Sequence, residues 1–149
     1  MNFDIEVTQD LPSCFALRHQ VFVLEQGVPV SEEQDALDNA AIHLLARDVQ
    51  GPLGTARIVC DRGTAKIGRV CILARARGQG LGADLIRKAV DLARADPEIN
   101  KVKLGAQTHA VRFYETLGFT PLGPVYLDAG IEHLLEVVVA RLRVPVGAL

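Results

Sequence analysis

The sequence has no basic excess, no paired-cysteine motif and no apolar run long enough to span a bilayer. With a formal net charge of −2 over 149 residues, nothing draws the chain as a whole to nucleic acid or to an anionic membrane. The three cysteines show no Cys-x-x-Cys spacing, and no His-x-x-x-His pair accompanies them, which argues against zinc and favours buried, reduced thiols. No signal peptide opens the chain, so we expect a cytoplasmic protein without metal, nucleic-acid or membrane partners.

Apolar residues make up 49% of the chain, which is enough for a buried core in one domain over residues 1–149. Strand-like runs, helical spacing and turn residues alternate along the sequence. They predict an α/β fold with a mixed, mostly antiparallel sheet flanked by helices, because too few helices separate the strands for a doubly wound parallel fold. We expect strands at Phe3–Val7, Ile42–Arg47, Leu53–Cys60, Lys66–Leu73, Lys101–Ala106, Thr120–Leu122 and His133–Ala140, helices at Leu11–Gln26, Leu81–Arg94 and Thr108–Leu117, and an acidic loop at Val28–Asn39.

The most informative segment reads Arg77-Gly-Gln-Gly-Leu-Gly82. It lies between the apolar run Lys66–Leu73 and the helical run Leu81–Arg94, so it joins a strand to the start of a helix. Glycines there allow an anion to approach the main chain, and the first N–H groups of the helix point at that anion. The segment therefore predicts a phosphate-binding loop.

Two familiar phosphate ligands fit this loop poorly. The spacing Gly78-x-Gly80-x-x-Ala83 satisfies a dinucleotide-binding fingerprint, but that fingerprint needs a carboxylate about 20 residues later to hold a ribose. Here the following strand ends in Gly105-Ala106-Gln107, without an acidic residue. A Walker loop is excluded because no Gly-Lys-Ser/Thr follows the glycines.

A third spacing, Arg77-x-x-Gly80-x-Gly82, resembles the signature of the GNAT superfamily of N-acetyltransferases, which binds the pyrophosphate of acetyl-coenzyme A. The downstream run Ala110-Val-Arg-Phe-Tyr-Glu-Thr-Leu-Gly-Phe119 is similar to a second motif of that superfamily. Further segments resemble a bacterial subgroup labelled ElaA-like or YjcF-like, so that the resemblance covers nearly the whole chain: Val21–Pro29, Gly54–Arg57, Lys66–Val70 and Asp128–His133.

The resemblance implies a donor site in a V-shaped split between the fourth and fifth strands. Main-chain groups of the fourth strand would pair with the pantetheine arm, and amides of the glycine loop would hold the pyrophosphate. Gln107 stands where many relatives carry Asn, so its contact with the coenzyme is left open. The residues expected at this site are Cys71, Ile72, Leu73, Arg77, Gly78, Gln79, Gly80, Leu81, Gly82 and Gln107.

Tyr114 is the expected general acid, since the superfamily often uses a tyrosine here to protonate the leaving thiolate, and a phenol with a pKa near 10 suits that task. The alternative is a core tyrosine whose hydroxyl is satisfied locally. Cys71 is less suited as a nucleophile, because no histidine is evidently paired with it. Direct transfer, without an acyl-enzyme, is expected.

The acceptor site and the base are sought in the acidic loop. No Lys or Arg occurs between Arg18 and Arg47, whereas five carboxylates do, so the loop is either a solvated surface or a negative cleft that attracts a cationic amine. Glu25 is the first candidate base, because partial burial at the end of an apolar helix would raise its pKa, and Asp38 is the second. The candidate acceptor-binding residues are His43, Arg57, which could hold a carboxylate of the substrate or of the acidic loop, and His133.

These residues together predict an enzyme that moves an acetyl group from acetyl-coenzyme A to a primary amine of a small molecule or peptide. The alternative is a catalytically silent acyl-coenzyme A sensor with the same fold, and Tyr114 argues against silence. The superfamily commonly dimerises through its late strands, and the apolar run Leu134–Ala140 makes a homodimer possible.

Overall fold

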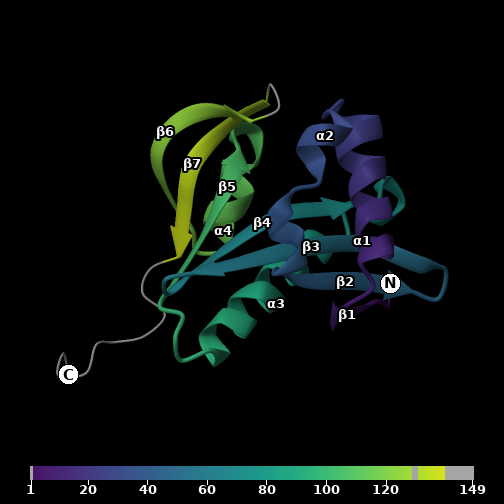
Figure 1. The fold of residues 1–149 in the computed structure, drawn as a ribbon, viewed down its shortest axis with the longest axis horizontal. Coiled ribbons are helices and arrows are strands. Elements are labelled where there is room, and N and C mark those ends of the chain that lie inside the picture. Colours follow the sequence, from purple (N-terminus) through teal and green to yellow (C-terminus); the bar gives the residue numbers. More distant parts are fainter. Residues whose placement is uncertain (1, 129–130, 140–149) are drawn as a thin grey trace.

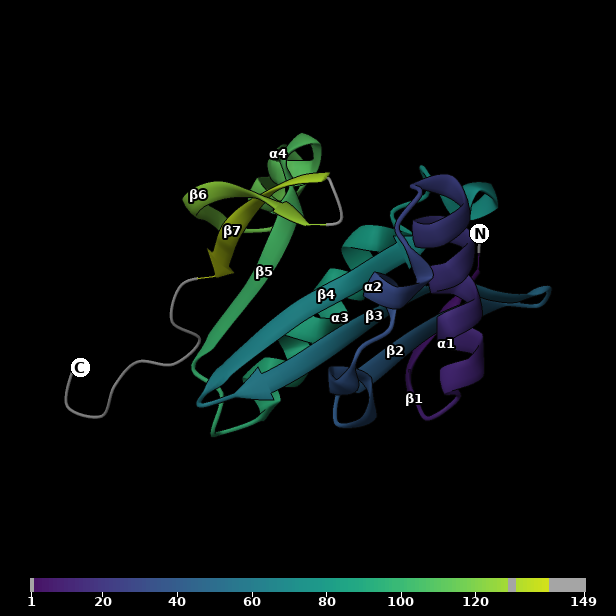
Figure 2. The same cartoon turned by 45° about the horizontal axis from the view of Figure 1, so that its top comes forward.

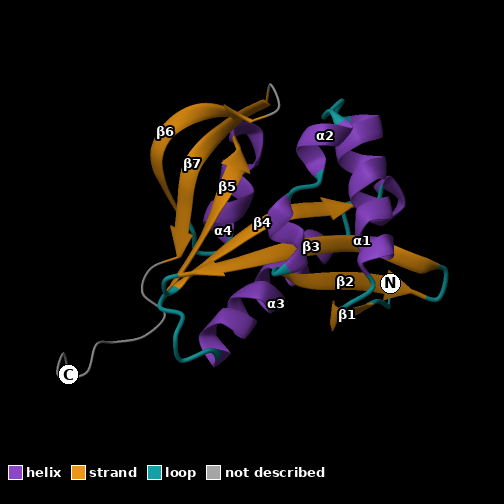
Figure 3. Ribbon diagram, viewed as in Figure 1, coloured by secondary structure: helices purple, strands orange, loops and turns teal. Residues whose placement is uncertain are grey.

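The computed structural model describes residues 2–128 and 131–139. Within them, one seven-stranded sheet runs in the order β1-β2-β3-β4-β5-β7-β6, and every neighbouring pair is antiparallel except β4 and β5 (Figures 1 and 3). This confirms the mixed, mostly antiparallel sheet. The strands are β1 (Asp4–Thr8), β2 (Ile42–Asp48), β3 (Gly51–Asp61), β4 (Thr64–Ile72), β5 (Lys101–Gln107), β6 (Thr120–Asp128) and β7 (Ile131–Val139).

Helices cover both faces of the sheet. Successive strand residues point to opposite faces, so Leu44 packs in the same cluster as Leu85 of α3 (Leu81–Ala95), whereas Leu45 packs with Cys14 of α1 (Leu11–Arg18). The remaining helices are the π-helix η1 (His19–Glu25), α2 (Val30–Glu33), the short η2 (Ala36–Asn39), η3 (Ala74–Ala76) and η4 (Thr108–Ala110), and α4 (Val111–Thr116). None of the helices in the described ranges is long and apolar enough to cross a membrane.

The sheet splits between β4 and β5. Their parallel pairing runs only from Thr64 opposite Lys101 to Ile67 opposite Leu104, and beyond that point the strands diverge (Figure 2). A bulge in β4 accompanies the split: the β3 register shifts there, and Arg69 has a φ of +50°. The strands therefore form the V-shaped opening that the sequence resemblance implied.

Three regions differ from the sequence expectation, and one of them is β6, which runs past the expected end at Leu122 to Asp128. The expected helix Leu11–Gln26 changes from α to π geometry at His19, where the Gln26 N–H donates to the Val21 carbonyl five residues earlier. The expected loop Val28–Asn39 contains α2 and η2, the latter capped by the Asp35 side chain.

Candidate active site

The glycine loop is shaped by two left-handed residues. Gly78 and Gly80 have φ values of +79° and +83°, and a Cβ built on either would meet no atom within 4 Å. Gly80 caps α3 without any side-chain hydrogen bond to the first turn, so the N–H groups at the start of the helix keep their hydrogen-bonding capacity. Gly82 is needed for a different reason: a Cβ there would lie 3.1 Å from Ile72 Cδ1, so its absence lets α3 pack against β4.

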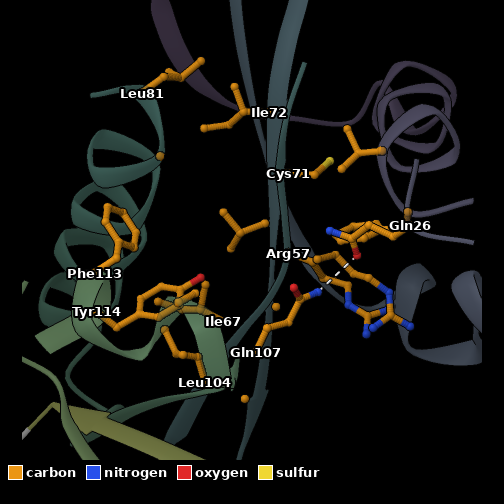
Figure 4. Close-up of a pocket in the computed structure, with 18 of the residues that line it drawn as sticks. Gln26, Arg57, Ile67, Cys71, Ile72, Leu81, Leu104, Gln107, Phe113 and Tyr114 are labelled. Carbon is orange, nitrogen blue, oxygen red and sulfur yellow. Dashed lines mark hydrogen bonds between the residues drawn. The ribbon is translucent and has the colours of Figure 1, made fainter. Parts of the chain in front are cut away.

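A pocket of about 700 Å³ occupies the split (Figure 4). Its walls come from β4, β5, the glycine loop, α4 and η1, which are far apart in the sequence. The sequence-predicted residues that line it are Glu25, Arg57, Cys71, Ile72, Arg77, Gly78, Gly80, Leu81, Gly82, Gln107 and Tyr114. Leu73, Gln79, Asp38 and His43 lie outside this lining.

Tyr114 presents its hydroxyl to the pocket from α4 (Figure 4). The ring is held edge-on between Phe113 and Phe119, with centroid separations of 5.1 and 6.0 Å. Burial raises the pKa of this phenol. Among the described residues, none forms a hydrogen bond with its hydroxyl, so the side chain is packed like a core residue but keeps its polar end for a ligand.

Arg77 connects the glycine loop to both neighbouring elements. Its Nη2 lies 2.7 Å from Glu25 Oε2, and its Nε donates to the Ile72 carbonyl over 3.0 Å. Glu25 is therefore an exposed, ion-paired carboxylate rather than the partly buried one expected from the sequence. Just after β4, the Leu73 N–H already donates to the Leu53 carbonyl of β3, so it is not a group that a pantetheine arm could use.

A second polar connection crosses the mouth of the split. Gln107 of β5 donates from Nε2 to Gln26 Oε1 over 3.1 Å, and its own Oε1 lies 2.6 Å from His109 Nε2 (Figure 4). Sequence reasoning missed Gln26 and assigned no role to His109, which is exposed. The available signal was the polar pair Glu25-Gln26 at the end of an apolar helix. Glu25 contacts Arg77 on one side of the pocket, and Gln26 contacts Gln107 on the other side.

Asp38 belongs to a buried ion-pair network. Arg18 is 1% exposed, and its guanidinium donates to Glu33 over 2.7 Å and to Asp38 over 2.7 Å. Burial alone would raise the pKa of Asp38, but the hydrogen bonds from Arg18, from a main-chain N–H and from Arg57 hold it well below its usual range. The expectation that Asp38 is a general base is therefore wrong, because a carboxylate stabilised in this way is a very weak proton acceptor. His43, also buried, lies with Nε2 2.9 Å from the Asp38 carbonyl, and its Nδ1 has no partner.

Three arginines neutralise the acidic loop, namely Arg18, Arg57 and Arg69. Arg57 pairs with Asp35 at 2.7 Å and with Asp38 at 3.0 Å, which is the second of the two roles expected for it. Arg69, at the β4 bulge, reaches Asp35 at 3.3 Å and Glu33 at 3.4 Å. Although burial opposes it, the Arg57 contact lowers the pKa of Asp35. The loop therefore does not form the strongly negative cleft that its composition indicated.

The cysteines are free. Burial raises the pKa of Cys71 to about 12 and also raises that of Cys14, so neither is a thiolate near neutral pH. Cys60 is exposed, contrary to expectation. The described residues hold no group of His, Cys, Asp and Glu side chains that could bind a metal ion.

His133 is placed only by its backbone. It pairs with Gln107 in β5 and with Tyr126 in β6, at the level of the split, and its side chain lies outside the described part of the structure. The side chains of the expected dimer segment Leu134–Ala140 also lie outside that part, as does Ala140 itself.

Comparison with known proteins identifies this arrangement. Residues 8–135 match the model of the acetyltransferase (GNAT) domain. The chain belongs to the GNAT acetyltransferase family. It is 40% identical to the uncharacterized N-acetyltransferase YjcF of Bacillus subtilis over 127 residues, which is 85% of this chain and 90% of YjcF. This confirms the resemblance to the YjcF-like subgroup and makes the chain an enzyme of acyl transfer.

Solved structures share the fold. A crystal structure of an acyl-CoA N-acyltransferase from Pseudomonas aeruginosa has 33% identity and a TM-score of 0.80, and the match covers 93% of this chain and 99% of that one. A GNAT family acetyltransferase from Elizabethkingia anophelis with acetyl-CoA bound has a TM-score of 0.70, over 93% of this chain and 98% of that one. Because its identity is 16%, that likeness concerns the fold alone.

Proposed function

We propose that this enzyme transfers the acetyl group of acetyl-CoA to the nitrogen of a primary amine by direct attack. The observation that carries the proposal is the Tyr114 hydroxyl, which has no partner among the described residues and points into the same pocket that the glycine loop borders. One pocket thus combines an anion-binding loop with a proton donor. The bound acetyl-CoA of the Elizabethkingia anophelis protein, which shares the fold, supports the choice of donor.

The residues fit the donor substrate. The loop at Gly78 and Gly80 has no side chains to obstruct a pyrophosphate, and the uncapped N–H groups at the start of α3 supply partial positive charge. The Ile72 carbonyl, now paired with Arg77, is the β4 group placed to accept from an amide of the pantetheine arm. Cys71 then contributes its main chain and packing rather than thiol chemistry.

In the reaction, the amine nitrogen forms a bond to the thioester carbonyl carbon and the carbon–sulfur bond breaks. Tyr114 gives its proton to the departing thiolate, and its raised pKa keeps the phenol protonated until that step. For the group that takes the proton from the amine we propose Glu25, which lines the pocket. In the free enzyme Arg77 holds this carboxylate, so the base acts once Arg77 turns toward the donor phosphates.

Release of the coenzyme A thiol, measured with acetyl-CoA and a panel of primary amines, tests the proposal. Tyr114→Phe keeps the packed ring and removes only the proton, so turnover should fall about 10²-fold with little change in acetyl-CoA affinity. Full activity of this variant would show that another group protonates the thiolate. Tight acetyl-CoA binding without turnover on any amine would instead indicate the silent sensor.

A further inference from the structure

The pairing register of β3 and β4 determines which residues form the floor of the pocket beyond the split. The pairs Arg57 with Gly68 and Val59 with Lys66 place three side chains and the bare Gly68 on one face of β3 and β4. This is the face that packs against α1, since Thr55 and Cys71 are paired on it and Cys71 lies in the Cys14 cluster. A Cβ added to Gly68 would meet no atom within 4 Å, so open space lies above this glycine.

The arginines and carboxylates next to this space already neutralise one another. Arg18, Arg57 and Arg69 meet Glu33, Asp35 and Asp38, three cations on three anions, in contacts of 2.7 to 3.4 Å. An acceptor therefore meets a neutral wall there, not the negative cleft expected from composition. Arg57 also keeps a buried Nε without a partner, at 6% exposure of the residue.

Lys66 takes no part in this neutralisation of charge. It is exposed, lines the pocket, and forms no ion pair or hydrogen bond with any described residue. The strand register sets it two residues from Gly68 on the same face, beside the open space above that glycine. An anion bound there would pair with the Lys66 ammonium.

Glu32 is the other charged side chain lining this end of the pocket for which the described residues supply no partner. It belongs to α2, whose Glu32 and Glu33 carbonyls accept hydrogen bonds from Arg69 of β4. A bound carboxylate is repelled by Glu32 and attracted by Lys66, so the two charges give the acceptor a direction.

We propose that the acceptor is an amine that also bears a carboxylate, as an amino acid or peptide does, and that this carboxylate binds above Gly68 beside Lys66. The inference rests on the proposed acetyl transfer and adds the class of its acceptor. Lys66 is a binding residue in this scheme, whereas Arg57 positions the wall next to it.

Matched acceptor pairs test this inference. L-Phenylalanine is compared with phenethylamine, and L-lysine with cadaverine, for the wild-type enzyme, for Lys66→Gln and for the control Lys88→Gln. Lys88 is an exposed lysine of α3 that pairs with no described residue and lies outside the pocket. The wild type should favour the carboxylate member of each pair. Lys66→Gln should raise KM for that member about tenfold, the low end for a hydrogen bond between charged groups, and so remove most of the preference over the plain amine.

Charge reversal sharpens the test, since Lys66→Glu should favour the plain amine. Equal or better use of the plain amine by the wild type overturns the inference, and so does an equal effect of Lys66→Gln and Lys88→Gln. If the enzyme acetylates only the plain amines, the proposed acetyl transfer is supported and the proposed carboxylate-bearing acceptor is refuted. No thiol release with any member of either pair, with acetyl-CoA binding intact, counts against both.

Discussion

Replacing Gly80 by valine should weaken acetyl-CoA binding by about 5- to 150-fold while the protein stays folded. Gly80 has a φ of +83°, a conformation in which a β-branched residue costs about 1–3 kcal/mol. The added Cβ meets nothing within 4 Å, so no core contact forces the loop to keep its shape, and the chain relieves the strain by leaving the conformation that presents its N–H groups. At tenfold for each 1.4 kcal/mol, that strain converts into the stated loss of affinity.

Gly118→Val is the matched control. Gly118 has a φ of +94°, its Cβ would also meet nothing within 4 Å, and it lies outside the pocket. Gly118→Val should lose up to about 1–3 kcal/mol of the free energy of unfolding and Gly80→Val no more than that, which a domain stabilised by about 5–15 kcal/mol tolerates. Titration calorimetry with acetyl-CoA should separate them, because only Gly80→Val weakens binding. Unchanged affinity of Gly80→Val, or an equal loss in both variants, would refute the assignment of the loop as the phosphate site.

The remaining predictions concern the thiol and the buried charges. Cys71→Ala should retain most turnover in the thiol-release assay, since a thiol with a pKa of about 12 is not the nucleophile; a loss of activity without a loss of acetyl-CoA binding would reopen an acyl-enzyme route. Arg18→Met should lower the free energy of unfolding by about 3–5 kcal/mol in urea titrations, because it leaves Glu33 and Asp38 buried without their main partner; a change under 1 kcal/mol would mean that water replaces the guanidinium. The lowered pKa values of Asp35 and Asp38 stabilise the folded state fully above their unfolded value of about 3.9 and lose this effect as pH falls below it, so the free energy of unfolding should drop between pH 5 and pH 2, and less steeply in Asp38→Asn.

The sequence was sufficient to predict the parts of the site that depend on local rules. Gly78 and Gly80 stand where backbone conformation permits little else, and their position between a strand and a helix predicts an anion site without knowledge of the fold. Tyr114 was found through a motif, and its ring packing follows from Phe113 and Phe119 in the same segment. Contacts of short sequence separation leave a readable pattern.

Ion pairs between residues far apart in the chain could not be predicted from the sequence. The sequence left the acidic loop as either a solvated surface or a negative cleft, because no Lys or Arg lies within it. The charges that neutralise Asp35 and Asp38 come from Arg18, Arg57 and Arg69, up to 34 residues away along the chain. The choice of Asp38 as a base failed for the same reason, since only the fold reveals the Arg18 contact.

β6 shows a smaller error of the same kind. The strand was expected to end at Leu122, whereas it continues through Gly123 and Pro124 to Asp128. The sheet order places β6 at the edge, where a proline removes no ladder hydrogen bond that a second neighbour needs.

The π geometry of η1 makes its length as important as its composition. Glu25 and Gln26 are consecutive, yet one reaches the glycine loop through Arg77 and the other reaches β5 through Gln107. A π turn holds about one residue more than the 3.6 of an α-helical turn, so η1 carries an extra residue relative to an α-helix. Deleting one residue between His19 and Glu25 would restore an α-helix while the residues after it keep their orientation. The same deletion in an ordinary α-helix would rotate everything after it by about 100°. A relative that lacks the extra residue can therefore connect the same two sides of the pocket, provided that an alignment places the gap inside this helix.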